Sequence, residues 1–418
     1  MPRILHFADA HIDISNYGRR DPKTGLPVRI LDFLASLDEI ITTAINENVD
    51  CVIFAGDAYK DRNPAPTFQR KWGSRIMRLS QAEIPTILLV GNHDISPSVG
   101  RAHALSEFIT LKVPHVRIID EPCFLSNENL SQLCAAGSTL EMQLIALPWI
   151  SRSSMTAALD IKTRDIEIIY QEMNVKLSTD LENWLEKADP ELPTVLTAHA
   201  SVEGATFGGE RTVSLGKDLV LPRSLVADPR IDYSALGHIH KQQDLNKGNH
   251  PPVVYPGSIE RVNFGEAEDE KYFVIADITK GKTKLDWRQL KGIRPFVDRF
   301  LKLESNDNIT EQVKNVLPDT DKLNDAIVRV ILDYPRAWDP LIDEPAIREL
   351  VKESFEFHFV KQPQTEPRIR LPKNTAIGSL SPEELLDQYW QVSKTPKKEI
   401  KVLNELARDI LHLDQDPE

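Results

Sequence analysis

The sequence predicts an α/β fold in which sheets and helices are stacked in layers. Over the first two-thirds of the chain, short apolar runs alternate with longer amphipathic stretches, a rhythm typical of layered α/β and α+β folds. The 418 residues are 41% hydrophobic and 27% charged, which excludes wholesale disorder and a collagen-like fibre. A chain of this length is expected to form two or three domains.

Seven apolar runs have the length and composition of buried strands. They lie at 4–8, 51–55, 86–90, 143–147, 194–197, 233–236 and 272–276. Three stretches between these runs predict helices, at 29–48, 67–82 and 165–187. The first of them has apolar residues at helical spacing at Ile30, Phe33, Leu34, Leu37, Ile40, Ile41 and Ile45.

A domain boundary is expected near Leu290, where a strand-like run ends and the turn-like segment 291–295 begins. A smaller pattern of strand, helix, strand, helix and strand follows. These elements are expected at 296–303, 309–316, 326–332, 344–353 and 355–360. We therefore expect a first domain over 1–290 and a compact α+β domain over 291–361, close to the lower size limit for an independent core.

The C-terminal part is predicted to be a linker, 362–380, followed by a helical tail, 381–418. The linker begins with a stretch rich in proline and charge. Ser381, Pro382 and the acidic pair that follows predict an N-cap, a first-turn proline and an acidic first turn. A last helix is expected over 397–413, with apolar positions at Ile400, Leu403, Leu406, Ala407, Ile410 and Leu411.

The chain is acidic, with a net charge of 50 − 63 = −13. This argues against a protein that coats nucleic acid by bulk charge, but bound cations can invert the electrostatics of an enzyme site. Cys51, Cys123 and Cys134 form no CxxC pair, which disfavours a disulfide framework or a zinc ribbon. No apolar run suggests a signal peptide or a membrane span, so a cytoplasmic protein is predicted.

Polar residues with ligand chemistry follow five of the predicted strands within a residue or two. They are Asp9-Ala10-His11, Gly56-Asp57, Gly91-Asn92-His93-Asp94, His199 and Gly237-His238-Ile239-His240. In layered α/β folds ligands bind at the carboxyl ends of strands, so five such ends can converge on one site. Glycines at these points suit a sharp exit from strand to loop.

The donor set of these motifs is typical of a metal centre. The candidate ligands are Asp9, His11, Asp57, Asn92, His199, His238 and His240. Oxygen and nitrogen donors without a thiolate suit manganese, iron, zinc or magnesium. Seven ligands are too many for one tetrahedral ion but fit two ions that share a carboxylate. Any single motif is common by chance, or as a turn, but chance does not explain all five after strands.

The order of these motifs resembles that of the calcineurin-like metallophosphoesterases. Within them the chain is similar to the SbcD-type nucleases, bacterial relatives of the double-strand-break repair exonuclease subunit, through three further stretches. These are 56–66, 233–241 and 255–261, the last followed closely by Phe264-Gly265-Glu266. The resemblance implies a four-layer β-sandwich flanked by helices for 1–290 and a capping domain for 291–361.

The resemblance also implies two divalent ions bridged by Asp57, with manganese expected and magnesium, iron or zinc as alternatives. Their ligands would be Asp9, His11, Asp57 and His240 for one ion, and Asp57, Asn92, His199 and His238 for the other. His93 resembles the family's catalytic histidine, which would protonate the leaving oxygen or stabilise developing charge. Asp94 is expected to orient His93, and the alternative is that it caps a turn.

Basic residues on the motif loops are candidates for contact with DNA phosphates, although each by itself is more often a solvated surface charge than a DNA contact. They are Arg19, Arg20, Lys60, Arg62, Arg101, Arg211, Lys241 and Arg261. The sequence contains no basic run with interleaved aromatic residues, so it does not predict sequence-specific readout of DNA.

The tail helices could dock in the groove of a partner or fold back on the body. The resemblance favours docking on an SMC-like ATPase of the SbcC type. That partner would supply ATP hydrolysis, because this sequence contains no Gly-rich Lys-Ser/Thr loop. It also implies a homodimer within a heterotetramer, formed through helices such as 67–82.

These observations predict a metal-dependent DNA nuclease subunit that hydrolyses phosphodiester bonds of DNA ends, hairpins or single strands. It would act with the ATPase in DNA repair and recombination, associated with the nucleoid. One alternative is a calcineurin-like phosphatase or phosphodiesterase with a non-DNA substrate. Another is a non-catalytic metal-binding scaffold, which His93 disfavours because a scaffold needs no additional imidazole.

Overall fold

The computed structural model describes residues 1–95, 102–159, 165–208, 218–364, 381–393 and 395–413. The chain divides into two compact units. One comprises Met1–Arg299, Asn315–Val330 and Pro345–Phe359, and the other comprises Phe300–Lys314, Ile331–Glu344 and Val360–Glu418. The domain boundaries expected from the sequence, after 290, 361 and 380, stay predictions. All candidate metal ligands lie in the first unit.

The first unit contains two six-stranded sheets. The order of the first sheet is β14-β13-β1-β2-β3-β4, and β1 to β4 are parallel while β13 is antiparallel to both neighbours. The bounds are β1 Arg3–Phe7, β2 Cys51–Phe54, β3 Thr86–Leu89, β4 Val116–Ile119, β13 Tyr272–Thr279 and β14 Lys282–Gln289. The carboxyl ends of β1, β2 and β3 therefore meet at one edge of this sheet.

The second sheet has the order β11-β12-β10-β7-β6-β5, with β6, β7, β10 and β12 parallel and the two edge strands antiparallel. The bounds are β5 Cys123–Leu125, β6 Gln143–Leu147, β7 Thr194–His199, β10 Tyr233–Gly237, β11 Gln243–Asp244 and β12 Val253–Tyr255. β7 and β10 pair in register from Tyr233 with Val195 to Gly237 with His199, so their carboxyl ends lie together.

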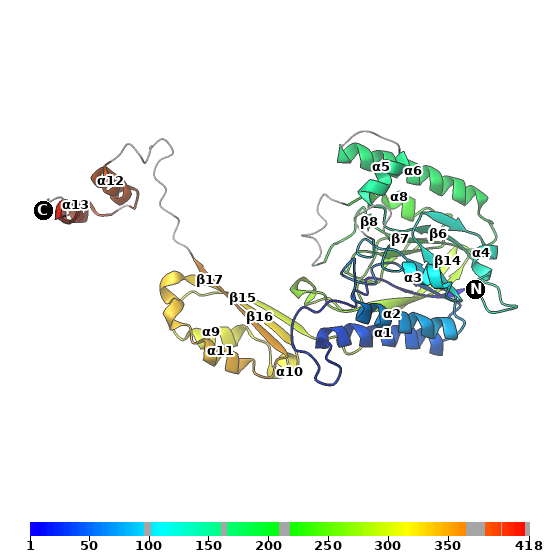
Figure 1. Ribbon diagram of the computed structural model, residues 1–418, viewed down its shortest axis with the longest axis horizontal. Coiled ribbons are helices and arrows are strands. Elements are labelled where there is room, and N and C mark those ends of the chain that lie inside the picture. The colour runs from blue at the N-terminus through cyan, green and yellow to red at the C-terminus, as the bar shows by residue number, and fades with distance from the viewer. Residues whose placement is uncertain (96–101, 160–164, 209–217, 365–380, 394, 414–418) are drawn as a thin grey trace. The chain divides into compact units, whose positions relative to one another are not determined.

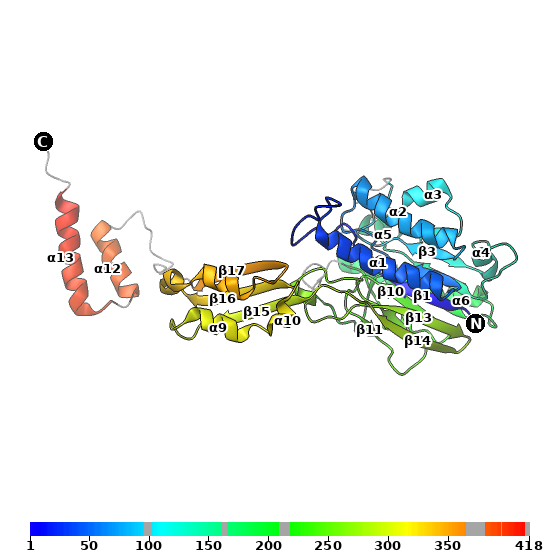
Figure 2. The same ribbon diagram turned by 90° about the horizontal axis from the view of Figure 1, so that it is seen from below.

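Three buried apolar clusters join these sheets and helices into four layers (Figures 1 and 2). The cluster between the sheets includes Ile53 of β2 and Ala235 of β10. The outer face of the first sheet packs on α1 (Val28–Asn46) and α2 (Pro66–Gln81). The outer face of the second packs on α6 (Ile166–Lys187). This arrangement confirms the predicted α/β class.

Helix α1 shows how the sequence produces this layering. The apolar side chains at its helical spacing, from Ile30 to Ile41, are buried against the first sheet. Burying each large aliphatic side chain contributes about 1.5–3 kcal/mol relative to leaving it exposed. Asp165 caps α6 as a side-chain acceptor for the backbone N–H of Glu167.

The first unit also contains shorter elements. They are α3 Ser106–Leu111, α4 Asn127–Ser131, α5 Arg152–Leu159, α8 Arg223–Val226, η1 Phe264–Glu266 and the two-stranded sheet of β8 Ser201–Val202 and β9 Val220–Leu221. The sequence patterns miss several short strands and most of β14, whose run Lys-Thr-Lys-Leu-Asp-Trp-Arg-Gln is too polar to resemble a buried strand. An edge strand has fewer neighbours to bury it, so it tolerates such residues.

A three-stranded sheet, β15-β16-β17, follows. Its strands and accompanying helices are β15 Phe296–Lys302, α9 Ile309–Val316, α10 Thr320–Leu323, β16 Ile327–Pro335, η2 Arg336–Leu341, α11 Glu344–Leu350 and β17 Glu356–Gln364. Each of the five elements that the sequence predicts in this region has a counterpart. β17 continues three residues beyond 361, into the segment predicted to be linker.

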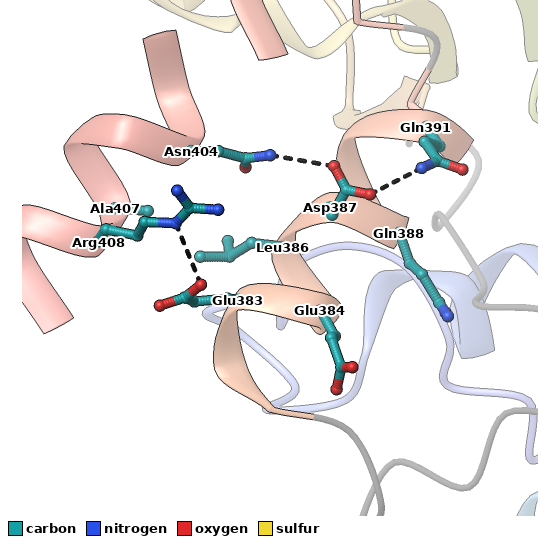
Figure 3. Close-up of a pocket in the computed structure, with 9 residues that line it drawn as sticks. All are labelled: Glu383, Glu384, Leu386, Asp387, Gln388, Gln391, Asn404, Ala407 and Arg408. Carbon is teal, nitrogen blue, oxygen red and sulfur yellow. Dashed lines mark hydrogen bonds and ion pairs between the residues drawn. The ribbon is translucent and has the colours of Figure 1, made fainter. Parts of the chain in front are cut away.

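The tail forms a helical hairpin of α12 (Pro382–Val392) and α13 (Lys397–Leu413). Ser381 and Glu384 form a capping box at the start of α12. Polar contacts join the two helices: Asn404 donates to Asp387 at 3.0 Å, and Arg408 pairs with Glu383 at 3.2 Å (Figure 3). Val402, Leu406 and Ile410 are more than half exposed, so this apolar stripe of α13 is open to solvent.

Among the described residues, the helices are all too short or too polar to cross a membrane.

His6 of β1 is a fully buried imidazole that links the two sheets. Its Nδ1 lies 2.8 Å from the hydroxyl of Tyr233 on β10. Burial lowers the pKa of His6 from 6.5 to about 3, so the folded protein holds this ring neutral. The unfolded chain takes up a proton near pH 6.5, and folding stability therefore falls as pH drops from about 6.5 towards about 3.

We expect the stability of His6→Asn to fall less at acid pH than that of the wild type, because the variant lacks the proton that His6 takes up on unfolding. The amide oxygen can accept from Tyr233 but does not titrate. The free energy of unfolding of the wild type should fall more steeply below pH 6.5 than that of the variant, by about 1.4 kcal/mol per pH unit. Urea unfolding between pH 4.5 and 8, with chelator present, measures the difference. The control Tyr233→Phe removes the hydrogen bond and should keep the steep slope; equal slopes for wild type and His6→Asn would contradict the prediction.

Candidate active site

The candidate ligands converge at the facing carboxyl ends of strands from both sheets. β1, β2 and β3 lead into Asp9, Asp57 and Asn92, while β7 ends at His199 and β10 leads into His238. Backbone contacts join the two sets closely. A Cβ at Gly237 would lie 2.1 Å from the carbonyl oxygen of Ala55, so only glycine allows the sheets to approach this closely. The predicted convergence of five strand ends is therefore present.

Four of the candidate ligands have left-handed backbone conformations. The φ angles are +51° at Asp9, +40° at His11, +65° at Asp57 and +98° at His238. Such conformations cost free energy for residues with a Cβ, and they persist only where the surroundings hold them. Their clustering at one place is typical of a functional site.

One half of the site brings two imidazoles and a carboxylate together. His11 Nδ1 lies 3.2 Å from the carbonyl oxygen of Tyr59, and His240 Nδ1 lies 2.8 Å from the Glu266 carboxylate. With a proton on each Nδ1, both Nε2 atoms present lone pairs, and these two atoms are 3.1 Å apart. Asp9 has an oxygen within 4.8 Å of both. Lone pairs that converge in this way repel one another and suit a cation.

The other half brings two imidazoles together with an amide and a carboxylate. His199 Nδ1 lies 2.7 Å from the carbonyl oxygen of Ala55, which leaves Nε2 facing Asn92 Oδ1 at 2.9 Å and Asp57 Oδ2 at 3.4 Å. His238 Nδ1 lies 3.0 Å from the same Asn92 oxygen, and its Nε2 lies 3.2 Å from Asp218. Asp57 approaches both His11 and His199, so its position between the two halves suits a bridging carboxylate.

The buried carboxylates of this site favour bound positive charge, whether a proton on an imidazole or a cation. Burial would lower the pKa of His199, but Asp57, Asp9 and the Ala55 carbonyl outweigh it and raise the pKa to about 9. Burial would raise the pKa of Asp57, yet the imidazoles around it hold that pKa well below its usual range. Burial raises the pKa of Asp9 to about 6. Buried carboxylates beside proton-binding imidazoles are chemically suited to divalent metal ions.

His93 lies beside this cluster without belonging to it. Its ring is 5.2 Å from that of His11, and its Nδ1 lies 2.9 Å from the carbonyl oxygen of Lys60. With a proton on Nδ1, the acceptor atom is Nε2, which lies 3.3 Å from the Lys60 ammonium. Burial lowers the pKa of His93, and the Lys60 charge acts in the same direction. His93 and Lys60 therefore form a hydrogen-bonded pair.

The structure corrects the expectation that Asp94 orients His93. Both Asp94 oxygens accept backbone N–H groups, those of Asp57 and Gly91 on Oδ2 and that of Ala58 on Oδ1, at 2.9–3.1 Å. The carboxylate thus holds the two metal loops together, which matches the turn-cap alternative. The orientation of His93 comes from Lys60, which no sequence pattern signals because the contact uses a backbone carbonyl.

A cavity of about 860 Å³ opens beside His93. Its lining includes Asp13, Lys60, Arg62, Asn63 and Phe68. Two of the basic residues singled out in the sequence, Lys60 and Arg62, thus share one cavity with the catalytic candidate. A negatively charged substrate that reached His93 through this cavity would pass both.

The other basic candidates lie in varied surroundings. Arg19 and Arg20 are exposed and donate to the backbone carbonyls of Phe355 and Gly25, and Lys241 is exposed. Arg261 does not fit the predicted role, because burial lowers its pKa and it donates to the backbone carbonyls of Asp269 and Arg294. Arg101 and Arg211 lie outside the described residues.

Comparison with known proteins agrees with this geometry. A model of the family described as calcineurin-like phosphoesterase matches residues 2–242. The SbcD subunit of nuclease SbcCD from Bacillus subtilis (strain 168) is 26% identical over 300 residues, covering 71% of each chain. Its counterpart from Escherichia coli (strain K12) is 25% identical over 291 residues, covering 67% of this chain and 66% of that protein. The DNA double-strand break repair protein Mre11 of Archaeoglobus fulgidus is 24% identical over 307 residues, covering 73% and 60%.

The family match covers more than half of the chain, which therefore belongs to the calcineurin-like phosphoesterase family. It is a metal-dependent phosphodiesterase, a hydrolase related at modest identity to the SbcD and Mre11 nucleases, and the resemblance inferred from the sequence is confirmed. The chain spans about two thirds of the length of these relatives, between 60% and 71%.

We expect Gly91→Ala to abolish metal binding. A Cβ at Gly91 would lie 2.1 Å from Asp57 Oδ1 and 2.4 Å from the Asp57 backbone nitrogen, so both the side chain and the backbone of Asp57 must move away from the position between the two halves of the site. For the wild type, Mn²⁺ at about 100 times its Kd should stabilise the fold by about 2.7 kcal/mol for each ion bound. The variant should lose this stabilisation, as measured by thermal unfolding with and without Mn²⁺.

The matched control is Gly73→Ala on α2, where the nearest atom to the new Cβ is 3.8 Å away. This variant should keep the full response to Mn²⁺. It should also gain about 0.5–1 kcal/mol of stability, because alanine loses less backbone entropy on folding than glycine does. An undiminished response in Gly91→Ala would show that Asp57 is not held in place for metal.

Proposed function

We propose that this chain is the nuclease subunit of a DNA repair complex and hydrolyses phosphodiester bonds at DNA ends. The observation that carries the proposal is the convergence of seven metal-type donors from five strand ends, with a further imidazole, His93, directly beside them. The similarity to the SbcD subunits of nuclease SbcCD supports DNA as the substrate. The protein would act in the cytoplasm, at the nucleoid.

In this proposal two divalent ions share Asp57. Asp9, His11, Asp57 and His240 would hold one, and Asp57, Asn92, His199 and His238 the other. Bound manganese, or magnesium, iron or zinc in its place, would activate a water and stabilise the entering and leaving oxygens of an in-line displacement. The chain itself also holds the ligands: the carbonyls of Tyr59 and Ala55 lie against the Nδ1 atoms of His11 and His199, and Asp94 accepts the backbone N–H of Asp57.

His93 and Lys60 would supply the proton that the leaving oxygen requires. The Lys60 ammonium donates to His93 Nε2, so a proton is shared between these two atoms at the mouth of the cavity. Transfer of this proton to the leaving oxygen would neutralise the alkoxide as the phosphorus–oxygen bond breaks. The Lys60 charge would also attract the phosphate, as would that of Arg62, which compensates locally for the net charge of −13.

The tail would dock on an SMC-like ATPase. The SbcD relatives are, by name, one part of a nuclease with more than one subunit. The exposed stripe of Val402, Leu406 and Ile410 on α13 is the kind of helix face that binds in the groove of a partner. An ATPase partner would also bind DNA that this acidic chain holds weakly.

We expect manganese-dependent cleavage of duplex DNA, and its loss in His93→Ala. Removal of a proton donor typically lowers kcat by about 10²–10⁴-fold, and since His93 is outside both ligand sets the variant should still bind two metal equivalents. Cleavage of end-labelled duplex with Mn²⁺, together with calorimetric metal titration, measures both quantities. Lys60→Met should show a similar loss of kcat if the two residues act together.

Chelator should abolish the activity, and fresh Mn²⁺ should restore it. A phosphopeptide and a generic phosphodiester serve as competing substrates in the same assay. Faster turnover of either than of DNA would favour a phosphatase or phosphodiesterase with a non-DNA substrate. Full activity of His93→Ala, or loss of its metals, would overturn the role given to His93.

We expect the apolar stripe of α13 to be required for recovery of the ATPase. A chain with Val402, Leu406 and Ile410 replaced by glutamate should recover it at least about tenfold less than the wild type, equivalent to 1.4 kcal/mol, as should a chain that lacks 381–418. The control carries glutamate at Ile168 and Val175, two exposed apolar residues of α6. Equal recovery by all four chains in a pull-down would contradict the docking role of the tail.

A further inference from the structure

A buried ion pair lies directly behind one of the candidate metal ligands. Glu266 Oε1 is 2.8 Å from His240 Nδ1, and Glu266 Oε2 is 2.6 Å from Lys271 Nζ. The side chains of Glu266 and Lys271 are 0% and 1% exposed. Charges are rarely buried so completely, because removal from water costs several kcal/mol per ion unless partners compensate it. The position of this pair therefore calls for an explanation.

The Glu266 carboxylate is surrounded by donors. Besides Lys271, the backbone N–H of Val262 donates to Oε2 at 3.2 Å, and the Ser258 hydroxyl lies 3.1 Å from the same atom. Lys271 also donates to Ser258 Oγ at 2.8 Å. With Oε2 bound to these groups, Oε1 faces His240. A carboxylate in such surroundings is an acceptor, so the proton of the bond to His240 belongs to Nδ1.

The segment 255–271 encloses His240 in further ways. The backbone N–H of Ser258 donates to the His240 carbonyl at 3.2 Å, and Lys271 Nζ lies 3.4 Å from the same oxygen. A Cβ at Gly257 would lie 2.5 Å from it, and the φ of +86° there also requires glycine. The stretch from Tyr255 to Glu266, noted in the sequence without an assigned task, thus forms the support of one histidine.

His240 differs from His11 and His199 in the charge of the group that its Nδ1 faces; another site histidine beside a carboxylate is His238, whose Nε2 lies 3.2 Å from Asp218. His11 and His199 direct Nδ1 at the neutral carbonyls of Tyr59 and Ala55, while the partner of His240 is a carboxylate. A carboxylate makes the imidazole a stronger donor at its other nitrogen, and it fixes the ring orientation and the tautomer. Lys271 offsets the added negative charge, so the buried surroundings of His240 gain no net charge.

We propose that Glu266 and Lys271 are a positioning pair that fixes the tautomer and orientation of His240, and so sets the affinity of the ion held by Asp9, His11 and His240. The inference rests on the proposed function, because it requires that the site bind metal. It assigns the effect of the pair to one ion, since Glu266 contacts His240 and no ligand of the His199 half. Loss of such a supporting carboxylate typically lowers metal affinity by about 10–100-fold.

The test is a titration of the metal-free full-length chain with Mn²⁺, followed by calorimetry and by the Mn²⁺ electron paramagnetic resonance signal. The wild type should bind two ions. Glu266→Gln should bind one ion as the wild type does and the other about 10–100-fold more weakly. Glu266→Asp keeps the charge for Lys271 but is one methylene too short to reach Nδ1, so it should show the same selective loss. A purely structural ion pair would leave metal binding of Glu266→Asp unchanged.

The matched control is Glu260→Gln. Glu260 is equally buried in the same loop, but it faces Arg29 and the backbone N–H of Arg261 rather than a site histidine. This variant should bind both ions with wild-type affinity, whatever its stability. A second measurement needs no metal: ¹⁵N spectra of histidine-labelled protein should show the His240 proton on Nδ1 in the wild type and a mixture of tautomers in Glu266→Gln.

The outcomes separate the two proposals. A wild-type chain that binds fewer than two ions would overturn the proposed metal centre and this inference with it. Two ions bound with wild-type affinity by both Glu266 variants, in a chain that cleaves DNA, would overturn the inference alone. Selective loss of one ion in both variants, with Glu260→Gln unaffected, would support it.

Discussion

Lone pairs of buried donor atoms repel one another in this site, and the fold has to hold these atoms close together against that repulsion. His11 Nε2 and His240 Nε2 lie 3.1 Å apart, and Asp9 has a carboxylate oxygen close to both residues. Acceptors at these distances separate unless a cation lies among them or the surrounding chain holds them. Three features hold them in place. They are the left-handed backbone at Asp9, the close approach of the sheets at Gly237 and the hydrogen bonds from backbone N–H groups to Asp94.

The two facing sheets provide the stiffness that this arrangement needs. The apolar cluster between them keeps their strand ends at a fixed separation, and helices cover both outer faces. A close-packed interior transmits small displacements, so a shift of one strand end would move a ligand by a similar distance. The fold therefore determines the geometry of the site as much as the ligands themselves do, which is why glycine is required where strands of the two sheets meet.

Much of this can be predicted from the residues, and the failures have physical causes. The strands that carry ligands are recognisable because buried parallel strands are continuous apolar runs, and the donor types follow each run directly. Adjacency in sequence suggests that Asp94 orients His93, but neighbours in a tight turn direct their side chains differently, and the three amides that Asp94 accepts are invisible in a sequence. The contact of Lys60 with His93 cannot be predicted from the sequence for the same reason, because it uses a backbone carbonyl. Arg261 fails as a DNA contact because its guanidinium donates to backbone carbonyls.

Residue types and their order along the chain are enough to predict the class of the fold, the candidate metal-type donors and the family. They leave open which group faces which atom, and folding in three dimensions settles that. The pairing of His240 with Glu266 and Lys271, of His93 with Lys60 and of Asp94 with the metal loops joins residues from separate elements or uses backbone atoms. Backbone carbonyls and amides are the same in every residue, so only folding gives them a specific partner.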